Sequence, residues 1–431
     1  MGRKIFLVVT VFLLAVSSAW ANSYIVLFKQ QELTITSLEH DALQQLLQST
    51  NQASVTQLTT WLGTYSVRAP QIRNLWLIRG AVVDLSDDLA TKLSHEGWVQ
   101  GLYVDTVRQM INPPSNLVVG NSLQDLGQDP ASMWGLERIG LGKIRAEFPK
   151  LDGSGITVGV IDTGIQSKHP ELGNAVVFKD FVNSLPLPYD DAGHGTHVSG
   201  TIAGKQVGIA PKVSFVFAKA FGAGGSATDS TLLAAMQWMF DPDGNPATND
   251  YPRIVSNSWG ADLVDKTWDI NQFLPYQQAL QAWIHGGIIP IFAAGNSGLS
   301  PNGFPGGLPD AIAVGAFSKG DAIADFSSRG PNLWLIGDSL LTLLKPDISA
   351  PGVAITSAYP GNKYATMDGT SMATPHVTGA VALLLQANPK LTYTDVKDLL
   401  LHSSERKANT SYGFGILDAY KLIKMGIGKI R

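Results

Sequence analysis

The distribution of hydrophobic residues along the chain changes near residue 132. Downstream of Trp134, short runs of β-branched and aromatic residues are each followed by a stretch with helical periodicity. The runs cover residues 157–161, 213–218, 254–257, 288–293 and 311–314. Strands that alternate with helices predict a mostly parallel sheet with helices on both faces, whose ligand site lies at the carboxyl ends of the strands. We therefore predict a doubly wound α/β unit over residues 132–431, with its chemistry directly after these strands.

Residues 22–110 follow a different pattern. Strand-like runs at 24–28, 75–78, 81–84 and 99–104 are interrupted by helix-like stretches at 38–47, 55–62 and 86–93, which predicts a small α+β domain. Residues 111–131 are rich in Asn, Pro, Gly and Ser and show little periodicity. We interpret them as a linker between the two units and expect the processing site within it.

The first residues have the features of a secretory signal. Arg3 and Lys4 precede an apolar run at 5–16, and small residues ending at Ala21 follow it. An uncleaved membrane anchor is the alternative, but the run is shorter than the roughly 20 residues that span a bilayer. We expect cleavage after Ala21, secretion out of the cell or into a periplasm, and no membrane anchor in the mature chain.

Composition narrows the possible partners. The 431 residues suffice for two or three folding units with a large core. A net charge of -4 offers no basic surface for phosphates, so we expect no nucleic-acid partner. The chain has no cysteine, so its stability outside the cell cannot depend on disulfides.

A carboxylate follows the first predicted strand of the downstream unit. Asp162 begins the tripeptide Asp-Thr-Gly at 162–164. Aspartic proteases use the same tripeptide, but they need two carboxylates that share a proton, and the chain has no second copy. Besides a plain turn at the strand end, this leaves the acid of a catalytic triad, which we favour.

Two histidines lie three residues apart where the next helix is predicted to begin. In the segment 193–200, glycines on both sides of His194 keep its imidazole uncrowded. Zinc would need further ligands, the spacing is not H-E-x-x-H, and there is no cysteine. We therefore predict a base at His194, a hydrogen-bonded structural histidine at His197, and no metal site here.

A serine opens the most apolar predicted helix. Ser371 would lie in its first turn, where free N–H groups and the positive end of the helix dipole can stabilise an oxyanion. Asn296 follows the run 288–293 and could donate a hydrogen bond to the same oxygen. Taken alone, the serine would be interpreted as an N-cap and the asparagine as a turn residue.

Together these segments resemble the subtilisin-like serine proteases. The sequences DTG, HGTHVSG, AAGNSG and GTSMATPHVTG occur in that family's order, and SNSWG, FSSRGP and APG extend the resemblance over about 134–420. Residues 22–110 are similar to the family's propeptide, which assists folding and inhibits the enzyme. The sequence around 241–260 resembles the bacillopeptidase F branch.

The resemblance implies a role for each of these residues. Ser371 would be the nucleophile, His194 the general base and acid, Asp162 its orienting partner, and Asn296 an oxyanion donor. The implied substrate-binding residues are Ser258, Trp259, Gly260, Ala294, Gly295, Ser297 and Gly303. No carboxylate lies among them, so we expect broad specificity with large apolar or aromatic residues before the cleaved bond.

The resemblance also implies a self-processing precursor of a monomeric endopeptidase that acts on proteins and peptides. No cofactor is needed for the chemistry. The family's calcium loop has no room in residues 201–211, and Asp241, Asp243 and Asn245 offer oxygen ligands elsewhere, although we favour a solvated loop there. An α/β-hydrolase would carry G-x-S-x-G before its partners, which this chain lacks around Ser371. A relative that only binds proteins would lack at least one of Asp162, His194, Asn296 and Ser371. All four are present in this chain.

Overall fold

The computed structural model describes residues 22–29, 39–67, 70–110, 117–130, 133–261, 267–405 and 408–429. The predicted signal peptide, residues 1–21, lies outside the described residues. Within the described part of the chain, no helix is long and apolar enough to cross a membrane.

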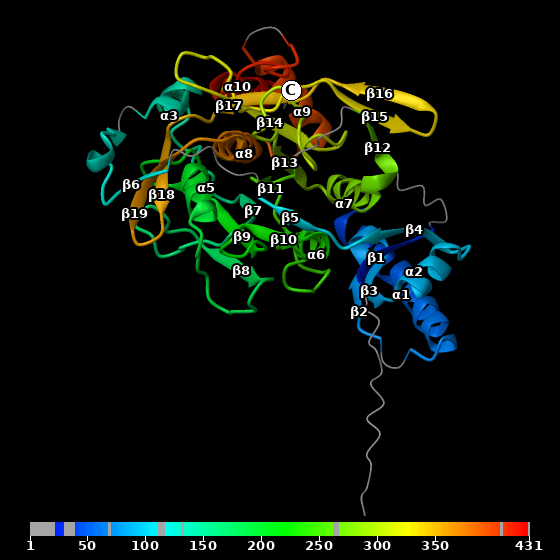
Figure 1. Ribbon diagram of the computed structural model, residues 1–431. Coiled ribbons are helices and arrows are strands. Elements are labelled where there is room, and N and C mark those ends of the chain that lie inside the picture. The colour runs from blue at the N-terminus through cyan, green and yellow to red at the C-terminus, as the bar shows by residue number, and fades with distance from the viewer. Residues whose placement is uncertain are drawn as a thin grey trace, which may run out of the picture.

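The N-terminal unit is a four-stranded antiparallel sheet with two helices (Figure 1). Its elements are β1 (Asn22–Phe28), α1 (His40–Thr64), β2 (Ile72–Leu75), β3 (Gly80–Leu85), α2 (Asp87–Ser94) and β4 (Val99–Val104), with strand order β2-β3-β1-β4. Because side chains alternate along a strand, Val26 and Phe28 pack on the helices while Ile25 and Leu27 point the other way. The predicted α+β pattern is present in this unit.

One helix replaces the two that the sequence predicts at 38–47 and 55–62. The polar stretch between them contains Asn51, which is buried in α1 and whose side-chain amide donates to Asn74 Oδ1 (2.6 Å) and Gly80 O (3.0 Å). The polar residue therefore ties the helix to the sheet and does not mark a break. The run at 75–78 is also different, because β2 ends at Leu75 and Trp76–Ile78 form a 3-10 helix.

The downstream unit is built around a seven-stranded sheet. Its strands are β7 (Thr157–Asp162), β8 (Val176–Asp180), β9 (Ser214–Lys219), β11 (Ile254–Asn257), β13 (Ile289–Ala293), β14 (Ile312–Phe317) and β17 (Ile348–Pro351). The order is β17-β14-β13-β11-β7-β9-β8, and every neighbouring pair is parallel.

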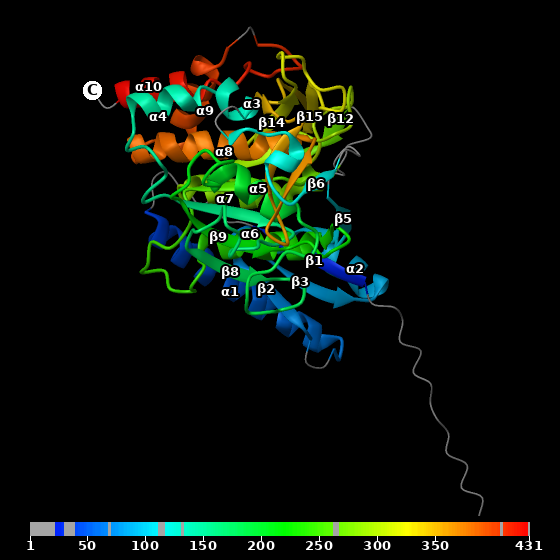
Figure 2. The same ribbon diagram turned by 90° about the vertical axis from the view of Figure 1, so that its left-hand side faces the viewer.

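Helices cover both faces of this sheet. The helices are α3 (Trp134–Arg138), α4 (Leu141–Glu147), α5 (His194–Ala203), α6 (Asp229–Phe240), α7 (Leu274–His285), α8 (Thr370–Ala387), α9 (Tyr393–Ser403) and α10 (Ala419–Gly428). In β9, Phe215 and Phe217 join the hydrophobic cluster of α5 and α8, whereas Val216 and Ala218 join that of α6 and α7. Figure 1 shows α5 and α8 on one side of the sheet and α6 and α7 on the other, and Figure 2 views the molecule from the side of α5 and α8. The predicted doubly wound α/β fold is confirmed.

Shorter strands lie outside the central sheet. They are β5 (Val107–Gln109), β6 (Val118–Gly120), β10 (Ser226–Thr228), β12 (Thr267–Asp269), β15 (Asn332–Ile336), β16 (Ser339–Leu343), β18 (Ile355–Tyr359) and β19 (Lys363–Met367). β6 pairs with β19, and the buried Leu123 joins the core of the downstream unit. Part of the predicted linker at 111–131 therefore belongs structurally to the downstream unit.

The N-terminal unit packs with the second face of its sheet against α6 and α7 (Figure 1). Ile25, Leu27 and Val82 share one hydrophobic cluster with residues of both helices. The ring of His40 stacks between Phe240 and Tyr251, at centroid distances of 4.0 and 3.6 Å. The interface thus combines an apolar cluster with side-chain hydrogen bonds, such as those of His40 to the carbonyl oxygens of Gly286 and Phe240 (2.7 and 2.9 Å).

Candidate active site

A buried carboxylate and imidazole form a direct pair at the carboxyl end of β7. Asp162 is the last residue of that strand, and its Oδ1 lies 2.8 Å from His194 Nδ1. His194 is the first residue of α5 and is 6% exposed, while Asp162 is fully buried. Burial alone would lower the pKa of His194, but the charge and hydrogen bond of Asp162 raise it above its ordinary value.

Asp190 holds the turn that presents His194. Its Oδ1 accepts from Thr163 Oγ1 (2.9 Å) and Gly193 N (2.8 Å), and its Oδ2 accepts from the backbone and hydroxyl of Thr196 (2.8 and 2.7 Å). The sequence analysis missed this residue. An aspartate four positions before the histidine, where a helix begins, is the signal that could have indicated it.

Gly193 is required by the same turn. Its φ is +88°, and a β-carbon at this position would lie 2.4 Å from the ring of Tyr359. Any side chain at position 193 would therefore clash with Tyr359 and shift the backbone next to His194.

Ser371 lies in the first turn of α8, which packs against α5. Its Oγ donates to Ser258 O (3.0 Å), and Ser258 Oγ donates back to Ser371 O (2.9 Å). Within the described residues, His194 Nε2 is buried and has no hydrogen-bond partner. The serine hydroxyl is thus turned toward the end of β11 and not toward the imidazole.

Asn296 and the backbone of Ser371 converge on one point. Asn296 Oδ1 accepts from Thr370 N (3.0 Å) and Thr370 Oγ1 (2.9 Å), which fixes the orientation of the side-chain amide. A β-carbon built on Gly369 would lie 3.5 Å from both Asn296 Nδ2 and Ser371 N. Two N–H donors therefore border the space beside Gly369, as an oxyanion site requires.

The segments predicted to bind substrate lie side by side. Gly303 N donates to Ala294 O (2.7 Å), and Ala261 and Phe304 exchange backbone hydrogen bonds (2.8 and 2.9 Å). A β-carbon on Gly303 would lie 2.8 Å from Ala261 O, so glycine permits this close approach.

Gly295 and Ser297 are held in place by the surrounding loops. Gly295 N donates to Thr370 Oγ1 (3.2 Å), and Ser297 N donates to Ser328 Oγ (3.1 Å). The loop after β13 is thus attached to the first turn of α8.

The indole of Trp259 lies in the core of the downstream unit. Its side chain is 2% exposed and packs against the rings of Phe221, Tyr276 and Phe292, at centroid distances of 5.9, 6.5 and 5.3 Å. The indole belongs to the core, so only the backbone of 258–260 can face a substrate.

β10 is the strand to which a segment of the N-terminal unit, β5, adds as a neighbouring strand. This pairing was not predicted from the sequence. β5 pairs with β10 in antiparallel register, with Gln109 opposite Ser226 and Arg108 opposite Ala227. Met110 N continues the ladder by donating to Gly225 O (2.7 Å). The glycines before Ser226 are the sequence signal for an edge strand at this position.

His197 is structural, in agreement with the sequence interpretation. Its Nε2 lies 3.0 and 3.1 Å from the carbonyl oxygens of Ile355 and Ala365. Burial lowers its pKa to about 3. His376 in α8 is also buried, with a pKa lowered to about 4.

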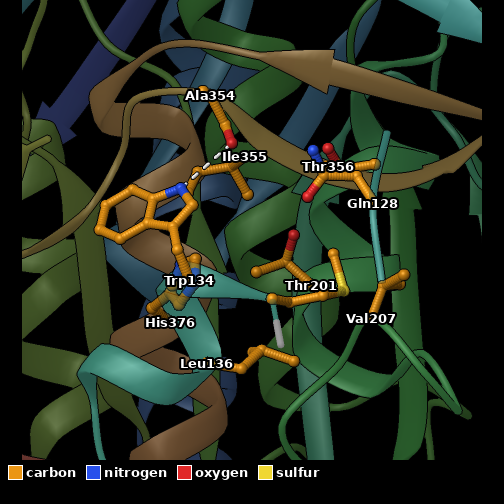
Figure 3. A pocket seen from close by; sticks show the side chains of 11 residues that line it. Gln128, Trp134, Leu136, Thr201, Val207, Ala354, Ile355, Thr356 and His376 are labelled. Carbon is orange, nitrogen blue, oxygen red and sulfur yellow. Dashed lines mark hydrogen bonds between the residues drawn. The ribbon is translucent and has the colours of Figure 1, made fainter. Parts of the chain in front are cut away.

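A small pocket beside α5 and α8 contains none of the predicted catalytic side chains. His376, Thr201 and Trp134 line it, and Trp134 Nε1 donates to Ala354 O (3.2 Å), as Figure 3 shows. It lies apart from the pair Asp162 and His194.

The acidic cluster in the loop after α6 contains Asp250 in place of the predicted Asn245. The carboxylates of Asp241, Asp243 and Asp250 lie together, whereas Asn245 Oδ1 accepts from Ala247 N (3.2 Å) within its own loop. Asp243 and Asp250 accept hydrogen bonds from the same loop. The solvated loop stays the favoured prediction here, with calcium binding as its alternative.

Comparisons with the sequences of known proteins identify the family of this chain. The model of the Subtilase family matches residues 153–415. Bacillopeptidase F of Bacillus subtilis (strain 168) is 32% identical over 403 residues, which is 84% of this chain and 27% of that protein. Subtilisin Savinase of Lederbergia lenta is 35% identical over 292 residues, 66% of this chain and 96% of that protein. Serine protease AprX of Bacillus subtilis (strain 168) is 37% identical over 305 residues, 62% of this chain and 66% of that protein.

The chain spans 27% of bacillopeptidase F but nearly the whole of subtilisin Savinase. The match to bacillopeptidase F covers more of the chain than the family model does, so it extends beyond residues 153–415. The family model covers most of the doubly wound unit, including Asp162, His194, Asn296 and Ser371. The chain therefore belongs to the subtilase family of serine endopeptidases.

Proposed function

We propose that this protein is a secreted, self-processing endopeptidase in which Asp162, His194 and Ser371 form the catalytic triad. The observation that carries the proposal is the buried Asp162–His194 pair, whose second imidazole nitrogen is unengaged among the described residues beside the helix that bears Ser371.

The proposed reaction begins with a rotation of the Ser371 side chain from Ser258 O toward His194 Nε2. His194 then accepts the hydroxyl proton as Oγ attacks the substrate carbonyl, while Asp162 stabilises the imidazolium through Nδ1. Asn296 Nδ2 and Ser371 N would donate to the oxyanion. His194 returns the proton to the leaving amine, and water hydrolyses the acyl-enzyme by the same steps.

Hydrolysis of a protein such as casein by the purified enzyme tests the proposed activity. A serine-directed covalent inhibitor should abolish hydrolysis and add one equivalent of label to the wild type but none to Ser371→Ala. A binding relative without catalysis would bind casein, release no peptides and take up no label.

The N-terminal unit is proposed to be a propeptide that occupies the substrate cleft. β5 pairs with β10 as a substrate strand would, by adding an antiparallel strand to an exposed edge. Ile111 is the first residue after the paired segment and is apolar. We place the processing site after Ile111.

The primary pocket is proposed to take large apolar or aromatic side chains. The segments 258–261, 294–297 and 303–304 would form its walls, and they contain no charged side chain. A basic substrate residue would find no partner there, and desolvating its charge would be costly. Peptide-library profiling should give Phe, Tyr, Leu or Met before the cleaved bond, and dominance of Arg or Lys at that position would refute this assignment.

A further inference from the structure

Arg108 of β5 is held in a second pocket, away from the proposed triad. Its Nε donates to Asp229 Oδ1 (2.9 Å) and its second nitrogen, Nη2, donates to Asp229 Oδ2 (2.8 Å). The backbone of Arg108 pairs with Ala227 in the β5–β10 ladder. The arginine therefore enters this pocket from the position that a residue of a bound substrate strand would occupy.

The pocket has the chemistry of a guanidinium site. Asp229 is 4% exposed, and its Oδ1 also accepts from the hydroxyl of Tyr276 (2.7 Å). The guanidinium carbon lies 5.7 Å from the ring centroid of Phe304, and the Tyr276 and Phe304 rings meet edge to face at 4.6 Å. A buried carboxylate with an aromatic wall suits arginine, which combines a bidentate fork with a flat, weakly hydrated face.

Residues of both units line this pocket, seven of the thirteen from the downstream unit. It has a volume of about 450 Å³ and lies where β4 and β5 meet α7. Its lining from the downstream unit consists of Asp229, Asn271, Gln272, Phe273, Pro275, Tyr276 and Phe304. These residues would stay in place after the N-terminal unit has been removed.

Asp229 does not serve as the N-cap of α6. The helix is capped by Thr228 Oγ1, which accepts from Thr231 N (3.2 Å), and Asp105 accepts from the backbone and hydroxyl of Ser230 (2.8 and 2.6 Å). Both oxygens of Asp229 are instead engaged by side chains of the pocket. Burial raises the pKa of Tyr276 well above its ordinary value, and Asp229 raises it further, so the hydroxyl remains a donor.

We propose that Asp229, with Tyr276 and Phe304, forms a specificity pocket that selects arginine in the substrate residue paired with Ala227. If cleavage follows Ile111, this residue is the fourth before the cleaved bond. The inference rests on the proposed binding of substrate as an added strand on β10. It gives the enzyme an apolar primary pocket and a separate acidic one.

Two matched fluorogenic peptides test this pocket on the secreted wild-type enzyme. Both carry Phe before the cleaved bond, and they differ only in arginine or citrulline, its neutral isostere, three residues upstream of that Phe. Loss of a bidentate charged pair predicts about 10- to 100-fold lower kcat/KM for the citrulline peptide. Moving the arginine one residue in either direction should remove the advantage, because adjacent strand positions point to opposite sides.

Asp229→Asn should reduce the arginine-to-citrulline ratio to about 1, whereas Asp152→Asn, at a partly exposed acid paired with Lys212, should preserve it. Equal kcat/KM for the two peptides with the wild type would overturn the proposed pocket while leaving the proteolytic function intact. Failure of the wild type to cleave either peptide would contradict the proposed function, and the pocket with it. The comparison of the two peptides with the wild type needs no variant, so it tests the arginine pocket even if Asp229→Asn does not fold.

Discussion

At the scale of single residues, the proposed role of the Asn296 side-chain amide as an oxyanion donor leads to a kinetic prediction. Its oxygen is fixed by two hydrogen bonds from Thr370, so its nitrogen is directed to the space beside Gly369. A hydrogen bond that forms only with the oxyanion stabilises the transition state and adds little to the affinity for the substrate.

Asn296→Ala should therefore lower kcat by roughly 10²- to 10³-fold with little change in KM. Thr370→Val, which removes one of the two anchors of Asn296, should cause a smaller loss of the same type. Steady-state kinetics on one peptide substrate measure both effects. A rise in KM at unchanged kcat for Asn296→Ala would show that the amide binds the ground state instead.

The local motifs explain why these residues could be found from the sequence. Asp162, His194, Asn296 and Ser371 each follow a strand or open a helix within a short, recognisable segment. Asp229 and Arg108 could not be paired in this way, because they are distant in sequence and meet only when β5 joins β10. Trp259 lies in a recognised segment, yet its side chain is buried in the core, where it contacts rings from three other segments of the chain.

At the scale of elements, α5 and α8 each bury a neutral histidine. The pKa of His197 is lowered to about 3 and that of His376 to about 4, in both cases chiefly by burial. The unfolded chain would protonate each near its ordinary pKa of about 6.5. A lowered pKa in the folded state means that stability is retained above pH 6.5 and lost as the pH falls toward 4.

His376→Gln should reduce the loss of unfolding free energy between pH 7 and pH 5 by about 2 kcal/mol. Urea unfolding in a Ser371→Ala background measures this without self-digestion, and His402→Gln, at an exposed histidine, is the matched control. A packing defect caused by the glutamine lowers the free energy of unfolding equally at both pH values. The difference between the two pH values therefore reports only the titration of His376. The same pH dependence in both variants would contradict the assignment of a neutral His376.

Strands were predictable where continuous apolar runs mark them and less so where tertiary contacts decide. Five strands of the central sheet, β7, β9, β11, β13 and β14, were evident from such runs because both of their faces are buried, whereas β8 and β17 were not predicted. The continuity of α1 depends on contacts of Asn51 with β2 and the start of β3, and β6 depends on pairing with β19 far along the chain. No local pattern contains that information.

At the scale of the whole molecule, the N-terminal unit packs on α6 and α7 and extends β5 along β10. Parallel sheets depend on long-range contacts and fold slowly, so a small unit that covers one side could lower that barrier. Its tail would then inhibit the enzyme until it is cut. A permanent binding domain is the alternative interpretation.

The secreted wild type should therefore lose residues 22 to about 111, whereas Ser371→Ala should accumulate as the uncleaved precursor. Gel mobility and N-terminal sequencing of both proteins, expressed with the leader and without another protease, measure this. Equal processing of the two would reject self-cleavage, and a mature N-terminus within α1 would reject the assigned boundary.

The triad itself is tested most directly by the coupling between its members. Asp162, His194 and Ser371 are proposed to act as one unit, so Ser371→Ala, His194→Ala and the double variant should each lower kcat by a similar factor, on the order of 10⁶, as in subtilisin. Single-substrate kinetics on folded, matched preparations of these variants provide the measurement. Losses that multiply in the double variant, or more than a few per cent of activity left in either single variant, would contradict the account.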